Sequence, residues 1–166
     1  MKFILAIVCC FMLSISKAQE VDFKDFTAYY LFNVGYTYQN INYFEGGLNA
    51  YLVQPNDNII DLGLTANMGY SNKNFIIYPE LQAGYLWNLK KTAIDPYSSN
   101  FNSAFWVIRS SISPWHITPE AGITIVSLID ITAGYGFEFR KNEKVDLEGF
   151  KFGISLRLPF LLFWHE

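Results

Sequence analysis

Three side chains that can carry acyl-transfer chemistry stand close together in the sequence: Ser110, His116 and Glu120. A serine activated by a histidine, with a carboxylate that orients the histidine, is the constellation of many hydrolases and acyltransferases. Spacing along the chain does not establish such a triad, because its members have to meet in space. A turn histidine beside Trp115 and an incidental serine are the simpler interpretation, so we expect no enzyme.

A second set of chemically capable residues is charged and is spread through the chain between apolar neighbours: Glu45, Asp61, Glu80, Arg109, Glu120, Asp130, Glu138, Lys151 and Arg157. The chain has no cluster of His or Cys with metal-ligand spacing, no phosphate-cradling loop after a strand and no basic stripe. We therefore expect no cofactor, no transition metal and no binding of nucleic acid.

The elements that must position these residues are predicted by an alternation of apolar and polar positions, which is the signature of a β-strand. The cleanest case is Ile60–Tyr70, where apolar side chains alternate with Asp61, Gly63, Thr65, Asn67 and Gly69. Eight segments alternate in this way: 28–38, 44–52, 60–70, 75–87, 104–112, 117–125, 129–139 and 150–160. Turn-forming residues separate them, among them Gln39–Asn42 and Pro55–Asn58, which indicates an antiparallel up-and-down order.

The apolar face of these strands contains no Asp, Glu, Lys, Arg, His, Asn or Gln, and Ser110 is its only hydrophilic residue apart from tyrosines. Such purity is typical of a surface that contacts hydrocarbon, since lipid offers polar groups no partner. Nine of the eleven glycines lie on the polar face, as expected for the narrow interior of an eight-stranded barrel. Pro79 and Pro119 each remove a ladder donor, so local defects are expected there.

The sequence therefore predicts an all-β fold, an eight-stranded antiparallel transmembrane barrel with its apolar face outside. Aromatic residues near the strand ends would form two interfacial belts. One belt would contain Tyr36, Tyr38, Phe44, Tyr70, Phe137, Phe139 and Phe150, and the other Trp87, Phe101, Phe160, Phe163 and Trp164. The alternative is a soluble barrel with an aromatic-rich core, such as a periplasmic lipocalin-like carrier.

Residues 1–18 have the pattern of a cleaved secretory signal peptide: a positive start at Lys2, an apolar run and the triplet Ser16–Lys17–Ala18. Cys9 and Cys10 both lie in this segment, so the mature chain would hold no disulfide. Residues 19–166 are expected to form one domain. The chain has 51% hydrophobic residues, 16% charged residues and a net charge of −3. This composition excludes disorder, and the negative charge excludes electrostatic binding to nucleic acid.

The chain resembles the small eight-stranded outer-membrane barrels of the OmpA and OmpX type, and its composition resembles that of outer-membrane proteins of Bacteroidota. Lys151, Gly153, Leu156 and Leu158 are similar to the signal that the barrel assembly machinery reads in the last strand. The resemblance implies the cell outer membrane as location, and outer-membrane lipids, lipopolysaccharide and the assembly machinery as partners.

Inside such a barrel the nine charged residues would form a network, because an unpaired buried charge is costly. We expect Glu80 level with Arg109, Glu138 level with Lys151, and Asp61 and Asp130 near Arg157. The network is either an ion or proton path or a structural plug, and the filled interior of eight strands favours the plug. The predicted role is structural or narrow transport, with a lipid A-modifying enzyme around Ser110 and His116 as the alternative.

Overall fold

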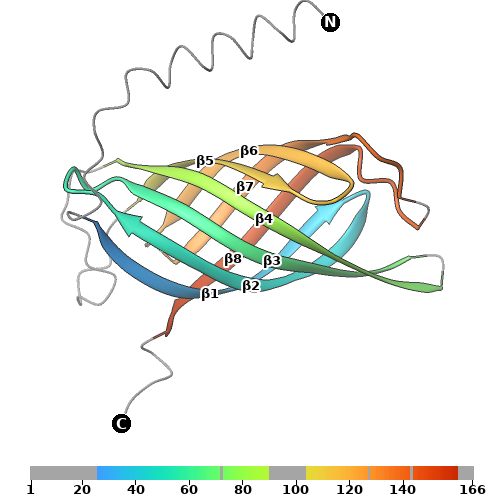
Figure 1. Ribbon diagram of the computed structural model, residues 1–166, viewed down its shortest axis with the longest axis horizontal. Coiled ribbons are helices and arrows are strands. Elements are labelled where there is room, and N and C mark those ends of the chain that lie inside the picture. The colour runs from blue at the N-terminus through green and yellow to red at the C-terminus, as the bar shows by residue number, and fades with distance from the viewer. Residues whose placement is uncertain (1–25, 72, 90–103, 127, 143, 161–166) are drawn as a thin grey trace, which may run out of the picture.

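The computed structural model describes residues 26–71, 73–89, 104–126, 128–142 and 144–160. Eight antiparallel strands, each hydrogen-bonded to its neighbour in sequence, close into a barrel where β1 pairs with β8 (Figure 1). The strands are β1 (Thr27–Gln39), β2 (Ile41–Val53), β3 (Ile59–Ser71), β4 (Asn74–Asn88), β5 (Phe105–Ile112), β6 (His116–Ile125), β7 (Ile129–Glu138) and β8 (Gly149–Pro159). Within the described residues, no helix is long and apolar enough to cross a membrane.

The predicted eight-stranded antiparallel up-and-down barrel is confirmed, and the strand bounds differ from the alternation pattern by a few residues at most. The largest difference is the predicted turn Gln39–Asn42, which is wrong. Asn40 alone reverses the chain with a φ of 60°, so Gln39 already pairs with Ile41. Asparagine tolerates this left-handed conformation better than other non-glycine residues. The predicted signal peptide and three belt residues, Phe101, Phe163 and Trp164, lie outside the described residues.

Most apolar residues of the strands point outward, and most polar residues point into the barrel. Phe150, Tyr70 and Leu81 are 79%, 68% and 63% exposed, whereas Asp61 and Arg157 are 0% exposed. The alternation that separates the two faces in the sequence thus sorts side chains between exterior and interior, because successive strand residues point to opposite sides of the sheet.

The interior also holds apolar residues, which the prediction of a polar, glycine-rich lumen omits. We call the end where β1 begins and β8 ends the proximal end, and the opposite end the distal end. One buried cluster lies near the proximal end: Leu31, Tyr51, Val53, Ile59, Leu86, Phe105 and Val107. A second lies near the distal end: Tyr43, Ile76 and Tyr78 from the strands, with Val145 and Leu147 from the β7–β8 connection.

The charged residues lie between these two apolar clusters. Along β4 the inward side chains follow one another as Ile76, Tyr78, Glu80, Gln82 and Leu86, with Gly84 between the last two. The barrel interior is therefore layered along its axis, with an apolar cluster at each end and a polar middle.

Both prolines sit where a ladder bond is not needed. The pairing of β4 with β5 begins at Leu81. Pro79 precedes this residue, so it has a partner strand on one side only, which is β3. In the β6–β7 ladder, neither Thr118 nor Pro119 has a paired residue, although the register is the same on both sides of the gap. The local defects expected from the sequence are present at both positions.

Candidate functional site

The strongest grouping of reactive side chains is the buried charge network in the middle of the barrel. Its proximal charge cluster consists of Asp61, Arg109, Asp130 and Arg157, contributed by β3, β5, β7 and β8. Arg109 Nη2 lies 3.0 Å from Asp61 Oδ2 and 2.6 Å from Asp130 Oδ2. Arg157 Nη1 lies 2.9 Å from Asp61 Oδ1, and its Nε lies 2.7 Å from Asp130 Oδ2. Two guanidinium groups and two carboxylates thus neutralise one another.

Neutral groups add hydrogen bonds to the proximal charge cluster, while Arg109 Nε and Arg157 Nη2 have no hydrogen-bond partner among the described residues. Asn49 donates a 2.7 Å hydrogen bond to Asp61, and Thr124 donates one of 2.7 Å to Asp130. The guanidinium of Arg157 also lies 5.3 Å from the ring centre of Tyr51, within the range of a cation–π contact. Each of these contacts offsets part of the cost of burying the four charges.

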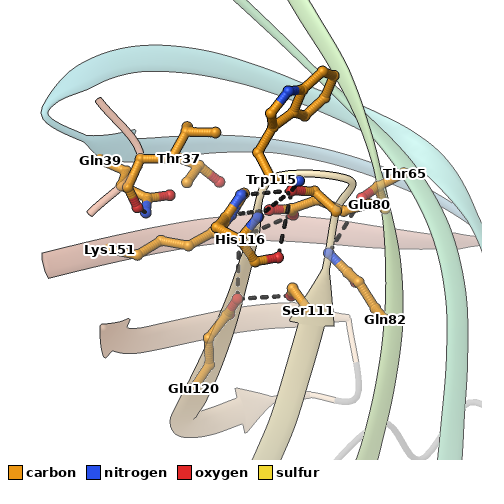
Figure 2. A network of polar contacts seen from close by, with 12 residues as sticks. Thr37, Gln39, Thr65, Glu80, Gln82, Ser111, Trp115, His116, Glu120 and Lys151 are labelled. Atoms are coloured by element: carbon orange, nitrogen blue, oxygen red, sulfur yellow. Dashed lines mark hydrogen bonds and ion pairs between the residues drawn. The ribbon is translucent and has the colours of Figure 1, made fainter. Parts of the chain in front are cut away.

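The distal charge cluster consists of Glu45, Glu80, His116, Glu120 and Lys151. Lys151 Nζ lies 3.0 Å from Glu80 Oε2 and 3.0 Å from Glu120 Oε1, so one cation joins two carboxylates from different strands (Figure 2). Ser111 and Thr132 donate further hydrogen bonds of 2.8 and 3.1 Å to Glu120.

His116 is fully buried between Glu80 and Ser113. Its Nε2 lies 3.1 Å from Glu80 Oε1, and its Nδ1 lies 2.6 Å from Ser113 Oγ. Ser113 Oγ already accepts the backbone N–H groups of Trp115 and His116. Its own hydrogen lies within reach of both His116 Nδ1 and the backbone oxygen of His116, which is 3.4 Å away. His116 thus links Glu80 of β4 to Ser113 of the β5–β6 turn.

Glu45 is surrounded by neutral donors. Asn33 Nδ2 lies 2.5 Å and Gln82 Nε2 lies 3.3 Å from its Oε1, and Thr37 Oγ1 lies 3.2 Å from its Oε2. No cationic group of the described residues forms an ion pair with this carboxylate.

Eight of the nine charged residues predicted to face the lumen are buried there. Glu138 is half-exposed near the distal end, where its Oε1 accepts the backbone N–H of Leu147. The expected pairing of Glu138 with Lys151 is wrong, because Lys151 lies opposite Gly134 of β7. Asp61 and Asp130 do lie beside Arg157, as expected.

The expected matching of Glu80 with Arg109 is also wrong. Glu80 binds Lys151 and His116, while Arg109 binds the two aspartates. The stagger of neighbouring strands around the barrel decides these partners, and it cannot be read from the sequence of any single strand.

Buried neutral side chains, which were not predicted as part of the site, bind the charges. They are Asn33, Thr37, Asn49, Gln82, Ser111, Thr124 and Thr132, and they are joined by His116. The signal that locates them is the same alternation, since every one occupies an inward position of its strand.

The structure does not bring Ser110 and His116 together. Ser110 is partly exposed and alternates with the inward residues Arg109 and Ser111, whereas His116 is 0% exposed inside the barrel. Ser113, which does contact His116, is itself buried.

No protein-family model, curated protein or solved structure matches the chain. The function is therefore inferred from the geometry of the barrel. Among the described residues, no three His, Cys, Asp or Glu side chains are arranged to hold a metal ion. What the charge network can do is cross-link strands that are distant in sequence, since its ion pairs connect β3, β4, β5, β6, β7 and β8.

Proposed function

We propose that the protein is a small barrel of the outer membrane of a Gram-negative bacterium, with a structural role and a closed lumen. The observation that carries the proposal is the exposed apolar band around the barrel. Soluble monomers rarely expose contiguous apolar patches larger than a few hundred Å². In this chain the outward positions of the strands are apolar except for Asn42 of β2 and Ser110 of β5, which is the pattern of lipid-facing strands.

The distribution of aromatic residues supports the same proposal. Exposed aromatic side chains gather near the distal ends of the strands: Tyr36, Tyr38, Phe44, Tyr70, Phe75, Phe137, Phe139 and Phe150. Others lie toward the proximal end: Tyr30, Trp87, Trp106 and Phe160. Aliphatic residues such as Leu64, Ile108 and Ile154 occupy the exposed surface between them. Aromatic belts that flank an aliphatic band suit the two interfaces and the hydrocarbon core of a bilayer.

The interior supports a closed lumen rather than narrow transport. An ion that crossed the barrel would have to pass the distal cluster around Tyr78 and Leu147 and the proximal cluster around Leu86 and Phe105, all four of which are 0% exposed. Between them, the side chains of the charge network are bonded to one another. The proposed role of the network is to hold the barrel together.

The two alternatives are supported less well. A lipocalin-like carrier needs an apolar cavity for its ligand, whereas here the middle of the interior holds eight buried charged residues. A lipid A-modifying enzyme around Ser110 and His116 needs both side chains at one site, whereas they lie on opposite faces of the barrel wall.

Assembly into the membrane is proposed to use the signal in β8. Leu156 and Leu158 point outward, while Lys151 and Gly153 point inward, so the segment presents an apolar face to its surroundings. Outer-membrane lipids and lipopolysaccharide are the proposed partners of the apolar band.

The test is fractionation followed by electrophoresis and conductance. We expect the protein in the outer-membrane fraction, soluble only with detergent, and with a gel mobility that changes on heating. In planar bilayers we expect no steady channel current. Recovery as a detergent-free soluble protein would refute the membrane proposal, and a conductance like that of a water-filled pore would refute the closed lumen.

A further inference from the structure

The outer wall of the barrel is hollowed along β5 and β6, where a groove has a volume of about 380 Å³. Its lining consists of Trp87, Trp106, Val107, Ile108, Ala121 and Gly122. Ala121 is an outward residue of β6 and lies directly opposite Ile108 in the β5–β6 ladder. The side chain of Ala121 is a single methyl group, whereas Trp106 and Ile108 of β5 carry large exposed side chains. The groove therefore exists because a small residue lies beside two large ones.

The lining of the groove is apolar, which decides what can fill it. Among the lining side chains, only the two indole N–H groups can form a hydrogen bond. An ordered water molecule needs about two to four polar partners, so an apolar hollow does not hold water. An unfilled groove would also leave its lining without dispersion contacts on one side. The groove therefore suits an apolar chain rather than water or a polar ligand.

The groove leads from the exposed aromatic residues of the proximal end toward the aliphatic part of the apolar band. Trp87 and Trp106 are directly opposed in the β4–β5 ladder and are 41% and 56% exposed. Tryptophan favours the level of the lipid headgroups, because its ring is apolar and its N–H is polar. Ile108 follows Trp106 by two residues toward the distal end of β5, with Ala121 beside it. A lipid acyl chain is arranged in the same way, with its ester near the headgroups and its methyl end in the hydrocarbon core.

We propose that this groove binds one acyl chain of a glycerophospholipid, an inference that rests on the proposed membrane location. An exported chain reaches the outer membrane from the periplasm, and the proximal end, where β1 begins and β8 ends, then faces the periplasm. The lipid is accordingly a phospholipid and not lipopolysaccharide, which occupies the opposite leaflet. The volume of the groove lies within the range of about 300–1,000 Å³ that is typical of ligand pockets. A chain seated there has contacts at its sides as well as beneath it, so it exchanges more slowly than lipid on the rest of the wall.

The test is a titration of the detergent-solubilised protein with phosphatidylethanolamine brominated along its acyl chains. The protein carries Trp106 as its only tryptophan, with phenylalanine at the other tryptophan positions, so bromine in the groove quenches its fluorescence. We expect quenching that saturates at about one lipid per barrel. Ala121→Phe should weaken this binding roughly tenfold or more, because a phenyl ring in the groove excludes several methylene groups. Ala83→Phe is the matched control: Ala83 is an exposed alanine of β4 that does not line the groove, so binding should be unchanged.

Native mass spectrometry of the protein with all its tryptophans is a second measurement. It should find a retained phospholipid on the wild type and on the Ala83→Phe protein but none on the Ala121→Phe protein. Ala121→Leu fills the groove with a smaller side chain and replaces Ala121→Phe in both measurements if that variant does not fold.

The possible failures of this test can be told apart. Quenching that rises with lipid without saturating, or equal lipid retention by the wild type and a folded Ala121 variant, would overturn the proposal. A dimer that retains no lipid would assign the groove to a second copy of the chain and would overturn it as well. A protein that stays in solution without detergent would refute the membrane location, whereas one that needs detergent but binds no lipid in the groove would refute the groove site alone.

Discussion

Replacing Arg157 by methionine is the most informative perturbation of the charge network. Arg157 is 0% exposed and holds Asp61 and Asp130 at 2.9 and 2.7 Å. Methionine fills a similar volume but leaves two buried carboxylates that share Arg109 alone. Removing one partner of a buried ion pair typically costs about 3–5 kcal/mol. For a chain of this size, that corresponds to a fall in the thermal unfolding midpoint of roughly 6–20 °C.

The assay is urea-induced unfolding in detergent or lipid vesicles, followed by tryptophan fluorescence. Arg140→Met is the matched control, because Arg140 is exposed after β7 and the same substitution there should change stability by less than about 0.5 kcal/mol. The double variant Asp61→Asn with Arg157→Met should recover part of the loss, since one carboxylate and one guanidinium then remain paired. Equal stabilities of the Arg157→Met and Arg140→Met proteins would refute the reasoning that the network holds the strands together.

Three further predictions address other parts of the barrel. Leu64→Arg places a charge in the middle of the exposed apolar band and should cost about 2–4 kcal/mol for folding into vesicles, as measured by the yield of the heat-modifiable form. Gly47→Ala should destabilise the barrel, because the added Cβ would meet the carbonyl oxygen of Leu64 and lie 2.7 Å from Thr65 Cα. Gly46→Ala should be tolerated, because the nearest atom to its added Cβ is 3.7 Å away. Urea titrations of the two variants measure this difference. His116→Leu should lower stability by about 1–3 kcal/mol, because Glu80 loses one of its two partners and Ser113 loses its contact with the ring. A mass profile of lipid A from cells that carry the variant should be unchanged.

The strands and their two faces could be predicted from the sequence because a β-strand has an exact period of two. In Ile60–Tyr70, every second residue is apolar, and the structure places Leu62 and Leu64 outside while Asp61 and Thr65 are buried inside. The position of a residue in an alternating segment was therefore enough to assign its face. The tight reversal at Asn40 was missed because one asparagine in a polar run looks like part of a longer turn.

Ion-pair partners could not be predicted in the same way. Glu80 and Lys151 are 71 residues apart and come from strands that are not adjacent in the barrel, so their meeting depends on the stagger of the strands and on its closure. The apolar clusters inside the barrel were missed for a related reason. Residues such as Tyr43 and Tyr78 occupy inward positions near strand ends, where the lumen needs large side chains to fill it.

The central claim, that the exposed apolar band contacts lipid, is tested most directly by fluorescence quenching with lipids brominated along their acyl chains. Trp106 is 56% exposed on the outward face of β5, whereas Trp115 lies in the β5–β6 turn and packs against Tyr78. We predict that, in vesicles, a variant with Trp106 as its only tryptophan is quenched strongly and one with Trp115 alone is quenched weakly. A folded protein whose Trp106 is not quenched by brominated acyl chains would contradict the account.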